Sequence, residues 1–174
     1  PLYLKNRAMF RYEGSNLGIT DSFQLDGKKQ SIKLINYQVI PASAELAQDL
    51  FLSPDDFVYK IERLRLIDDQ PFMIETGFVP IKIIPTLSPA VAEKSIFNYL
   101  EEAKGKTVTR SFMTLTVEPS SANDQKELNL TPTEPVGVME GVFFLDDGTP
   151  FEVSYMRVHY QYMRYNTFVS LGKE

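Results

Sequence analysis

The sequence predicts one α+β domain, residues 1–174, with a six-stranded, mainly antiparallel sheet and short helices, built from two β-α-β-β repeats. Three observations carry this prediction. Residues 39–72 resemble residues 117–151, apolar and polar residues alternate in several segments, and turn residues fall at matching places in both copies. Strands joined largely by hairpins form an antiparallel sheet, and short helices then cover a face of it. A chain of 174 residues is long enough to bury one such core.

The internal repeat rests on residues that coincide when the two segments are superposed. One additional residue in the second turn then brings Pro150-Phe151 onto Pro71-Phe72. The identical pairs are Val39/Val117, Pro41/Pro119, Ser43/Ser121, Ala44/Ala122, Leu50/Leu128, Leu52/Leu130, Pro54/Pro132, Val58/Val136, Glu62/Glu140, Asp68/Asp146 and Asp69/Asp147. Because prolines, capping serines and Asp-Asp turns all recur, the same fold unit is expected twice.

Each copy begins with an alternating strand, residues 31–40 in the first and 107–118 in the second. A proline follows, then a serine suited to cap a short helix. The expected helices are 44–51 after Ser43 and 122–129 after Ser121. A Leu-x-Leu-[Ser/Thr]-Pro segment then leads into a strand, an Asp-Asp turn and a returning strand.

A further helix is predicted between the two copies, over residues 95–105. Ser95 stands at its cap and Gly105 at its end, and the apolar residues between them fall on one face. The serine is most simply a helix cap, although helix N-termini also bind anions.

Composition excludes several classes of site. The chain has no cysteine and a single histidine, His159, so disulfides, thiolate metal sites and multi-histidine sites are ruled out and no cofactor is expected. A net charge of −5 argues against nucleic-acid binding by this segment alone. No apolar run reaches membrane-spanning length and no signal peptide is present, so we expect a cytoplasmic protein without membrane contact.

The hairpin around residues 61–80 carries charges where a buried strand is expected. Arg63 and Arg65 share one face of the strand, because side chains two residues apart point the same way. The position of Glu75 depends on the turn. A three-residue loop, 68–70, places it opposite Arg63, whereas a two-residue loop, 69–70, places it on the other face.

Two interpretations of these charges remain open. Two guanidinium groups on one face can hold a phosphate or carboxylate through paired hydrogen bonds. Alternatively, they form solvated cross-strand pairs with the glutamate on a sheet edge. In the second copy, Gly141 and Phe143 replace the two arginines, so we expect the scaffold to tolerate other residues there, which favours a functional role.

The last predicted strand adds weaker candidates. Glu152 opens an alternating segment whose later members are mostly apolar or aromatic; taken alone, an acid at a strand end facing water is the simpler interpretation. If that face points inward, Glu152 is a semi-buried acid that needs hydrogen-bond donors. The nearby tyrosines are more often core or interface residues than ligand contacts.

Taken together, these segments resemble the UTRA domain, the effector-sensing domain of GntR-type bacterial transcription regulators of the HutC subfamily. The resemblance covers about residues 20 to 170 and rests on "ERLR", "PFMIETGFVP", "SIFNYL" and "DDGTPFE". It implies a chorismate-lyase-like fold, a homodimer, and a winged helix-turn-helix domain upstream that alone contacts operator DNA. The acidic charge and the start at Pro1 would then reflect the absence of that domain.

The resemblance also implies a site for a small-molecule effector, often a sugar phosphate or an amino-sugar phosphate. The residues of this chain that match the family's ligand contacts are Arg63, Arg65, Glu75, Ser95, Glu152, Tyr160, Ser22 and Phe23. The last segment, residues 157–168, departs from the family pattern, so Tyr155 and Tyr162 remain alternatives to Tyr160. Placing the arginines and Glu75 in one site implies the odd-length turn.

Two other functional classes compete with a regulator that acts without catalysis. An enzyme of the same fold, similar to chorismate lyase, could use the arginines and a glutamate to bind a dicarboxylate and transfer a proton. An interaction module without a ligand is the third possibility.

Overall fold

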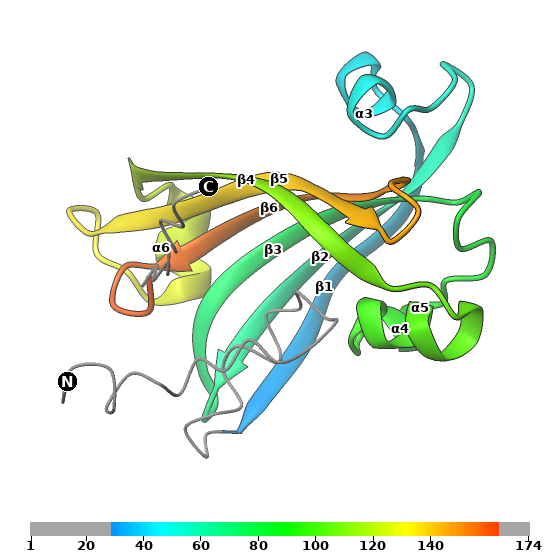
Figure 1. The fold of residues 1–174 in the computed structure, drawn as a ribbon. Helices are drawn as coiled ribbons and strands as arrows, with labels where there is room; N and C mark the ends of the chain where they lie inside the picture. The colour runs from blue at the N-terminus through cyan, green and yellow to red at the C-terminus, as the bar shows by residue number, and fades with distance from the viewer. Residues whose placement is uncertain (1–28, 164–174) are drawn as a thin grey trace, which may run out of the picture.

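The computed structural model describes residues 29–163, which form one six-stranded sheet with short helices and confirm the predicted α+β class (Figure 1). The strands lie in the order β1-β2-β3-β6-β5-β4, and every neighbouring pair is antiparallel. The elements are β1 Gln30–Pro41, α3 Ala44–Asp49, β2 Phe57–Ile67, β3 Gln70–Pro80, α4 Pro89–Ala92, α5 Ile96–Lys104, β4 Val108–Pro119, α6 Ala122–Leu128, β5 Pro135–Leu145 and β6 Pro150–His159.

The two predicted repeats form the two halves of the sheet. The first half is β1-α3-β2-β3 and the second is β4-α6-β5-β6. They join where β3 pairs with β6, with Thr76 opposite Tyr155 and Gly77 opposite Ser154. Matching residues of the two copies therefore lie on either side of the centre of the sheet.

Local capping chemistry explains where the predicted helices begin and end. The side chains of Ser43, Ser95 and Ser121 each accept a backbone N–H from the first turn of α3, α5 and α6. Gly105 ends α5 in the left-handed conformation with φ 61°. The four-residue helix α4 was not predicted, because one turn is too short to show helical periodicity.

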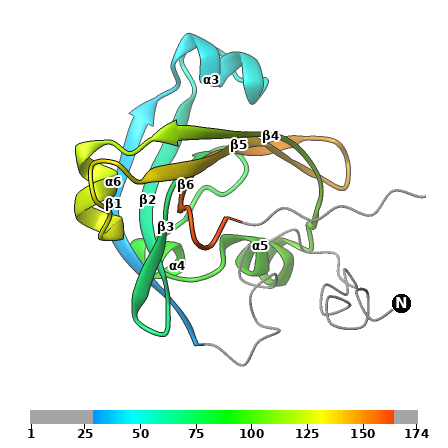
Figure 2. The ribbon, with the colours of Figure 1, turned by 90° about the vertical axis from the view of Figure 1, so that its left-hand side faces the viewer.

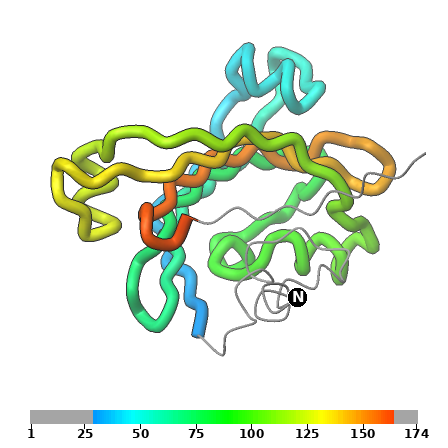
Figure 3. Tube along the Cα trace, turned by 60° about the vertical axis from the view of Figure 1, so that its left-hand side comes forward, coloured from blue at the N-terminus to red at the C-terminus, as the bar shows by residue number. Residues whose placement is uncertain are grey.

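Helices α4 and α5 cover one face of the sheet, which we call the inner face; α3 lies on the opposite side (Figures 2 and 3). The inner face carries Ile61, Met73 and Met156, packed with Ile96 and Leu100 of α5. These side chains are nearly completely buried, so this core contributes most of the apolar burial of the domain.

Helices α3 and α6 cover the two ends of the outer face. Leu46 of α3 packs with Val58 and Val153, while Leu128 of α6 packs in a separate cluster at the other end. Arg157 of β6 also ties α6 to the sheet, because its Nε lies 2.9 and 3.0 Å from the carboxylate oxygens of the buried Asp124. The middle of the outer face lies between these two clusters.

The turn between β2 and β3 differs from both expected lengths. Ile67 pairs with Gln70, so the loop consists of Asp68 and Asp69 alone. Both aspartates have positive φ, 48° and 63°, as a type I′ turn requires. Expecting the loop at 68–70 or 69–70 was wrong, because aspartate tolerates the left-handed conformation well enough to occupy both central positions.

A β-bulge restores the register that the short turn would otherwise shift. The pairing steps from Leu66 opposite Pro71 to Arg65 opposite Met73, which leaves Phe72 as the additional residue. Phe72 is fully buried in the inner core, so its packing holds the bulge. As a result, Glu75 lies opposite Arg63 and faces the same side of the sheet.

We expect Asp69→Gly to stabilise the domain, because glycine adopts the left-handed conformation without the steric penalty of a side chain. The free energy of unfolding should rise by about 0.5–1 kcal/mol in urea denaturation. Gly148, with φ 86° in the turn before β6, supplies the reverse control: Gly148→Ala should lower stability. A neutral or destabilising Asp69→Gly would contradict the proposed strain at this turn.

Candidate functional site

Arg63, Arg65 and Glu75 form a buried ion cluster on the inner face. Nη2 of Arg63 lies 3.0 Å from Oε2 of Glu75, and Nε of Arg65 lies 2.7 Å from the same oxygen. All three residues are at most 5% exposed. The alternative of solvated pairs on a sheet edge is therefore wrong, since β2 and β3 are interior strands and the charges are withdrawn from water.

Arg63 also anchors the connection between α4 and α5. Its Nη1 donates to the carbonyl oxygen of Lys94 at 3.1 Å and to that of Ala92 at 3.4 Å. Ser95 follows directly, and its Oγ accepts the N–H of Asn98 as the cap of α5. The arginine thus brings the start of α5 close to the cluster, although the Ser95 side chain itself serves the helix.

Glu152 of β6 lies in the same buried region. It is 1% exposed, and its Oε2 has no hydrogen-bond partner within the described part of the chain. Its carboxyl group lies directly over Gly77 of β3, where a Cβ atom would come within 2.6 Å of Oε1. The absence of a side chain at Gly77 is therefore what admits the carboxyl group.

Two further polar atoms in this region lack partners among residues 29–163. They are Nε of Arg63 and Oγ of Ser154, and both are buried. Unsatisfied buried donors and acceptors are uncommon in folded proteins, and each one normally has a functional or solvent partner. The inner face therefore holds a donor, a hydroxyl group and a carboxyl oxygen that are buried without partners among the described residues.

The two glutamates titrate in opposite directions. Burial raises the pKa of Glu75, but attraction by Arg63 and Arg65 outweighs it and lowers the pKa to about 2. Burial and, after it, repulsion by Glu75 raise the pKa of Glu152. Arg63 and Arg65 act in the opposite direction, and the resulting pKa is about 8. The pKa values of the two neighbouring carboxyl groups are thus shifted in opposite directions, an arrangement typical of functional sites.

Gly141 and Phe143, which replace the arginines in the second repeat, are fixed by the packing of that half of the sheet. A Cβ atom on Gly141 would lie 1.9 Å from the backbone oxygen of Phe112, so glycine is required at that position by the approach of β4. Phe143 is a core residue, edge-on to Phe97 with ring centroids 5.2 Å apart. The second half needs its own residues there, so it does not measure tolerance in the first half.

The three candidate tyrosines, at positions 155, 160 and 162, lie in three different parts of the domain. Tyr160 donates its hydroxyl to Glu134 at 3.0 Å and stacks on His159, so it does not join the arginine cluster. Tyr155 lies on the outer face, edge-on to Phe78. Tyr162 instead packs against the inner core beside Phe72, with ring centroids 5.8 Å apart.

Of the eight predicted site residues, the structure brings four together: Arg63, Arg65, Glu75 and Glu152. Ser95 lies one residue from a carbonyl that Arg63 contacts. Ser22 and Phe23 lie outside the described residues. Sequence reasoning missed Gly77 and Ser154, although a glycine inside an alternating strand is a known sign of close approach.

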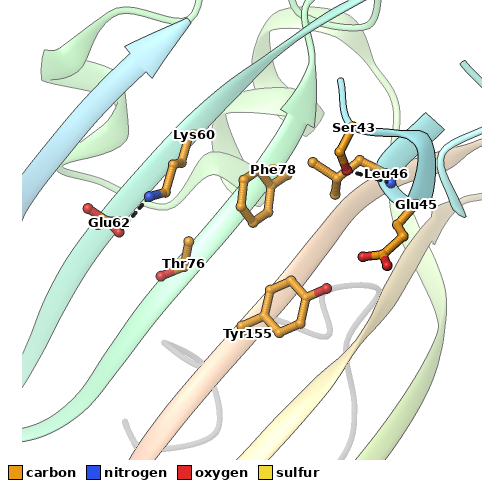
Figure 4. A pocket seen from close by; sticks show the side chains of 8 residues that line it. All are labelled: Ser43, Glu45, Leu46, Lys60, Glu62, Thr76, Phe78 and Tyr155. Atoms are coloured by element: carbon orange, nitrogen blue, oxygen red, sulfur yellow. Dashed lines mark hydrogen bonds and ion pairs between the residues drawn. The ribbon is translucent and has the colours of Figure 1, made fainter. Parts of the chain in front are cut away.

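A shallow groove of about 410 Å³ lies on the outer face, between α3 and the strands (Figure 4). Phe78 and Tyr155 lie between the charged ends of Glu62 and Glu45. Burial and, after it, the carboxylates of Glu140, Asp49 and Glu45 raise the pKa of Tyr155. Lys60 also lines the groove, but it is paired with Glu62 at 3.0 Å, so acids predominate and the groove suits an anion less well than the arginine cluster on the other face.

Residues 29–163 hold neither a metal-ligating cluster nor a membrane-spanning helix. No group of three His, Cys, Asp or Glu side chains in that range is arranged to hold a metal ion. None of the helices in the described part is long and apolar enough to cross a membrane.

The UTRA domain model matches residues 26–164, which is most of the chain. Among curated proteins, the HTH-type transcriptional repressor NagR of Bacillus subtilis is 31% identical over 159 residues, covering 86% of this chain and 64% of its own length. The mannosyl-D-glycerate transport/metabolism system repressor MngR of Escherichia coli is 29% identical over 122 residues, covering 70% and 51%. The chain thus spans between half and two thirds of these relatives.

Solved structures give a consistent picture of the fold. The crystal structure of a GntR-family transcriptional regulator from Bacillus cereus superposes with a TM-score of 0.70 at 30% identity, covering 81% of this chain and 99% of that one. The described sheet and helices are therefore shared with a known regulator over nearly all of its resolved length.

Proposed function

Since the chain belongs to the UTRA family, the effector-binding domains of GntR-type transcription regulators, we propose that it binds a sugar phosphate or a related anionic metabolite. In this proposal, occupancy changes the DNA affinity of a winged helix-turn-helix domain elsewhere in a cytoplasmic homodimeric protein, which acts as a repressor. The observation that carries the ligand class is the pair of buried arginines that share a single ionised carboxylate.

The charge of the cluster favours an anionic ligand. Arg63 and Arg65 contribute two positive charges and Glu75 one negative charge, while Glu152 holds its proton at neutral pH. A buried site with one surplus positive charge gains from a bound phosphate or carboxylate, because a charge in a low-dielectric interior needs a counter-charge. The name of MngR, which refers to a mannosyl-D-glycerate system, supports a carbohydrate-derived anion.

The residues take different roles in this proposal. Arg63 and Arg65 hold the anionic group, with help from Ser95 and from the segment that contains Ser22 and Phe23. Glu75 and Glu152 contact hydroxyl or amino groups of the ligand. Tyr160 would have to leave Glu134 to take part, so Tyr162 is the tyrosine better placed for contact from the inner face.

Ligand and DNA are coupled reciprocally in such a regulator. If the effector weakens operator binding by a given factor, operator DNA weakens effector binding by the same factor. The domain needs no covalent chemistry for this, only a difference in affinity between two arrangements of the dimer.

The alternative of a chorismate-lyase-like enzyme is not favoured, because the similar proteins are transcription regulators. Incubation of the chain with chorismate should give no release of pyruvate above the uncatalysed rate.

Replacement of Arg63 by methionine tests the ligand class. Calorimetric titration with a panel of sugar phosphates should give binding by the unmodified chain and at least about thirtyfold weaker binding by Arg63→Met, the loss of a charge-assisted hydrogen bond. Arg110→Met is the matched control, since Arg110 is exposed on β4 and donates only to a turn carbonyl among the described residues.

A second variant keeps the test valid if Arg63→Met does not fold. Arg65→Lys keeps the positive charge but loses the planar fork that binds an anion through two bonds, so binding should weaken while the melting temperature changes little. Equal affinity of the unmodified chain, Arg63→Met and Arg65→Lys for the same sugar phosphate would overturn the assignment of the site.

A further inference from the structure

We propose that the buried carboxyl group of Glu152 carries a proton in the ligand-free domain and that an anion binds to the arginine cluster only while this proton is present. The effector site would then take up its anion together with a proton and lose affinity in alkaline solution. This inference rests on the proposed function, because it assumes that the ligand is anionic.

The geometry around Glu152 favours a neutral carboxyl group. The side chain is 1% exposed, and its Oε2 has no partner among residues 29–163. Both nearby arginines direct a donor to the same oxygen of Glu75. An ionised carboxylate in such a place loses its hydration, and Oε2 gains no donor among residues 29–163 in exchange, so the protonated form is favoured.

The charged neighbours of Glu152 come from two strands. Glu75 of β3 repels a charge on it, while Arg63 and Arg65 of β2 attract one. On the remaining neighbour, β5, the residue paired with Glu152 is Phe143, which has no charge. The arginines already share a carboxylate, so burial and the Glu75 charge dominate, and the pKa of Glu152 rises to about 8.

Anion binding and this proton are linked through charge. With Glu152 protonated the cluster has one surplus positive charge, and with Glu152 ionised it has none. A bound anion next to Glu152 disfavours its ionised form further, so binding raises its proton affinity. By linkage, the anion then binds most tightly below pH 8, and its affinity falls as the pH rises above that value.

Gly77 is the feature of the backbone that makes this arrangement possible. A Cβ atom at residue 77 would lie 2.6 Å from Oε1 of Glu152, so a side chain there would clash with this carboxyl group. The carboxyl group is thereby held over β3, two residues along the strand from Glu75 and on the same face. Glu75 and Glu152 therefore lie close together on the inner face, and Glu75 is the one whose carboxylate pairs with Arg63 and Arg65.

The test measures affinity against pH with two probes that do not change charge between pH 7.5 and 9.5, glucose 6-phosphate and inorganic sulfate. Calorimetric titration of the unmodified chain should give an affinity that falls between pH 8 and 9.5 by about tenfold per unit at the upper end. Titrations near pH 8.5 in buffers of different ionisation enthalpy should also show net proton uptake.

Glu152→Gln is the decisive variant, because the amide has nearly the same shape and no ionisable proton. Sulfate has no hydroxyl group for residue 152 to contact, so its affinity for Glu152→Gln should stay constant within about twofold up to pH 9.5. Glu102→Gln, an exposed acid on α5, is the matched control and should keep the pH dependence of the unmodified chain.

The possible outcomes separate this inference from the proposed function. Binding with the same affinity from pH 7.5 to 9.5 in the unmodified chain would overturn the proton linkage and leave the anion site intact. No binding of either probe at any pH would count against the anion site.

If neither probe binds, the proton on Glu152 can still be observed directly by infrared spectroscopy. A band of a protonated carboxyl group should be present at pH 6.5, be absent in Glu152→Gln and disappear on titration through about pH 8. Its absence from the unmodified chain at pH 6.5 would overturn the inference independently of any ligand.

Discussion

Glu75→Ala is expected to lower the free energy of unfolding by about 3–5 kcal/mol at neutral pH, the loss typical of breaking a buried ion pair by removing one partner. The substitution takes away the carboxylate that Arg63 and Arg65 share. Arg63 and Arg65 are at most 5% exposed as whole residues, so water cannot replace the lost negative charge without opening the sheet or displacing α5. Urea denaturation monitored by circular dichroism measures the change.

Glu62→Ala provides the matched control, because Glu62 lies on the neighbouring strand and also pairs with a cation. Its ion pair with Lys60, at 3.0 Å, is about 28–30% exposed and faces the outer groove. A partly solvated pair of this kind contributes at most about 1 kcal/mol. A loss for Glu75→Ala no larger than that for Glu62→Ala would show that the buried cluster does not hold β2 and β3 together.

The sequence was sufficient for the fold because the same local patterns appear twice. Ser43 and Ser121 mark equivalent helix starts, and both are observed as caps. The face of Glu75 could not be derived this way, because it depends on a two-residue turn and a bulge that compensate each other. The bulge is held by burial of Phe72, a tertiary contact with no local pattern.

The candidate site was predicted only in part for a similar reason. The alternation of β2 correctly places Arg63 and Arg65 on one face, whichever register the hairpin adopts. The burial of Glu152 could not be derived from the sequence, since it depends on pairing between the two halves of the sheet and on the glycine beneath it. The position of Tyr160 follows from its hydrogen bond to Glu134, a contact across the second half that strand parity does not reveal.

Glu152→Gln is expected to stabilise the domain at neutral and alkaline pH, although it removes a buried side chain of the candidate site. The pKa of Glu152 is about 8 in the folded domain and near 4.5 in an unfolded chain. Between these values the folded state binds the proton and the unfolded state does not, so stability falls as the pH rises from 4.5 to 8. The loss reaches about 3 kcal/mol at pH 7, and the glutamine variant avoids it.

Urea denaturation at pH 4.5, 7 and 8.5 tests this expectation. The unmodified chain and Glu152→Gln should have similar stability at pH 4.5 and diverge by about 3 kcal/mol or more at pH 8.5, while Glu102→Gln should follow the unmodified chain. The pKa of Glu75, lowered to about 2, has the opposite effect: its contribution is complete above about pH 4.5 and is lost as the pH falls toward 2. It therefore does not affect the comparison at pH 7 and above.

In the Glu75→Ala background, Glu152→Gln should lower the free energy of unfolding instead of raising it. In Glu75→Ala the arginines lose their shared carboxylate, and Glu152 becomes the nearest acid that can ionise to compensate them. Replacing it by glutamine in that background then removes a needed negative charge and lowers stability. A double-mutant cycle at pH 7 should give a coupling energy well above the roughly 0.5 kcal/mol seen for independent sites. Additive effects would mean that the two carboxyl groups titrate independently, contrary to their placement over one strand.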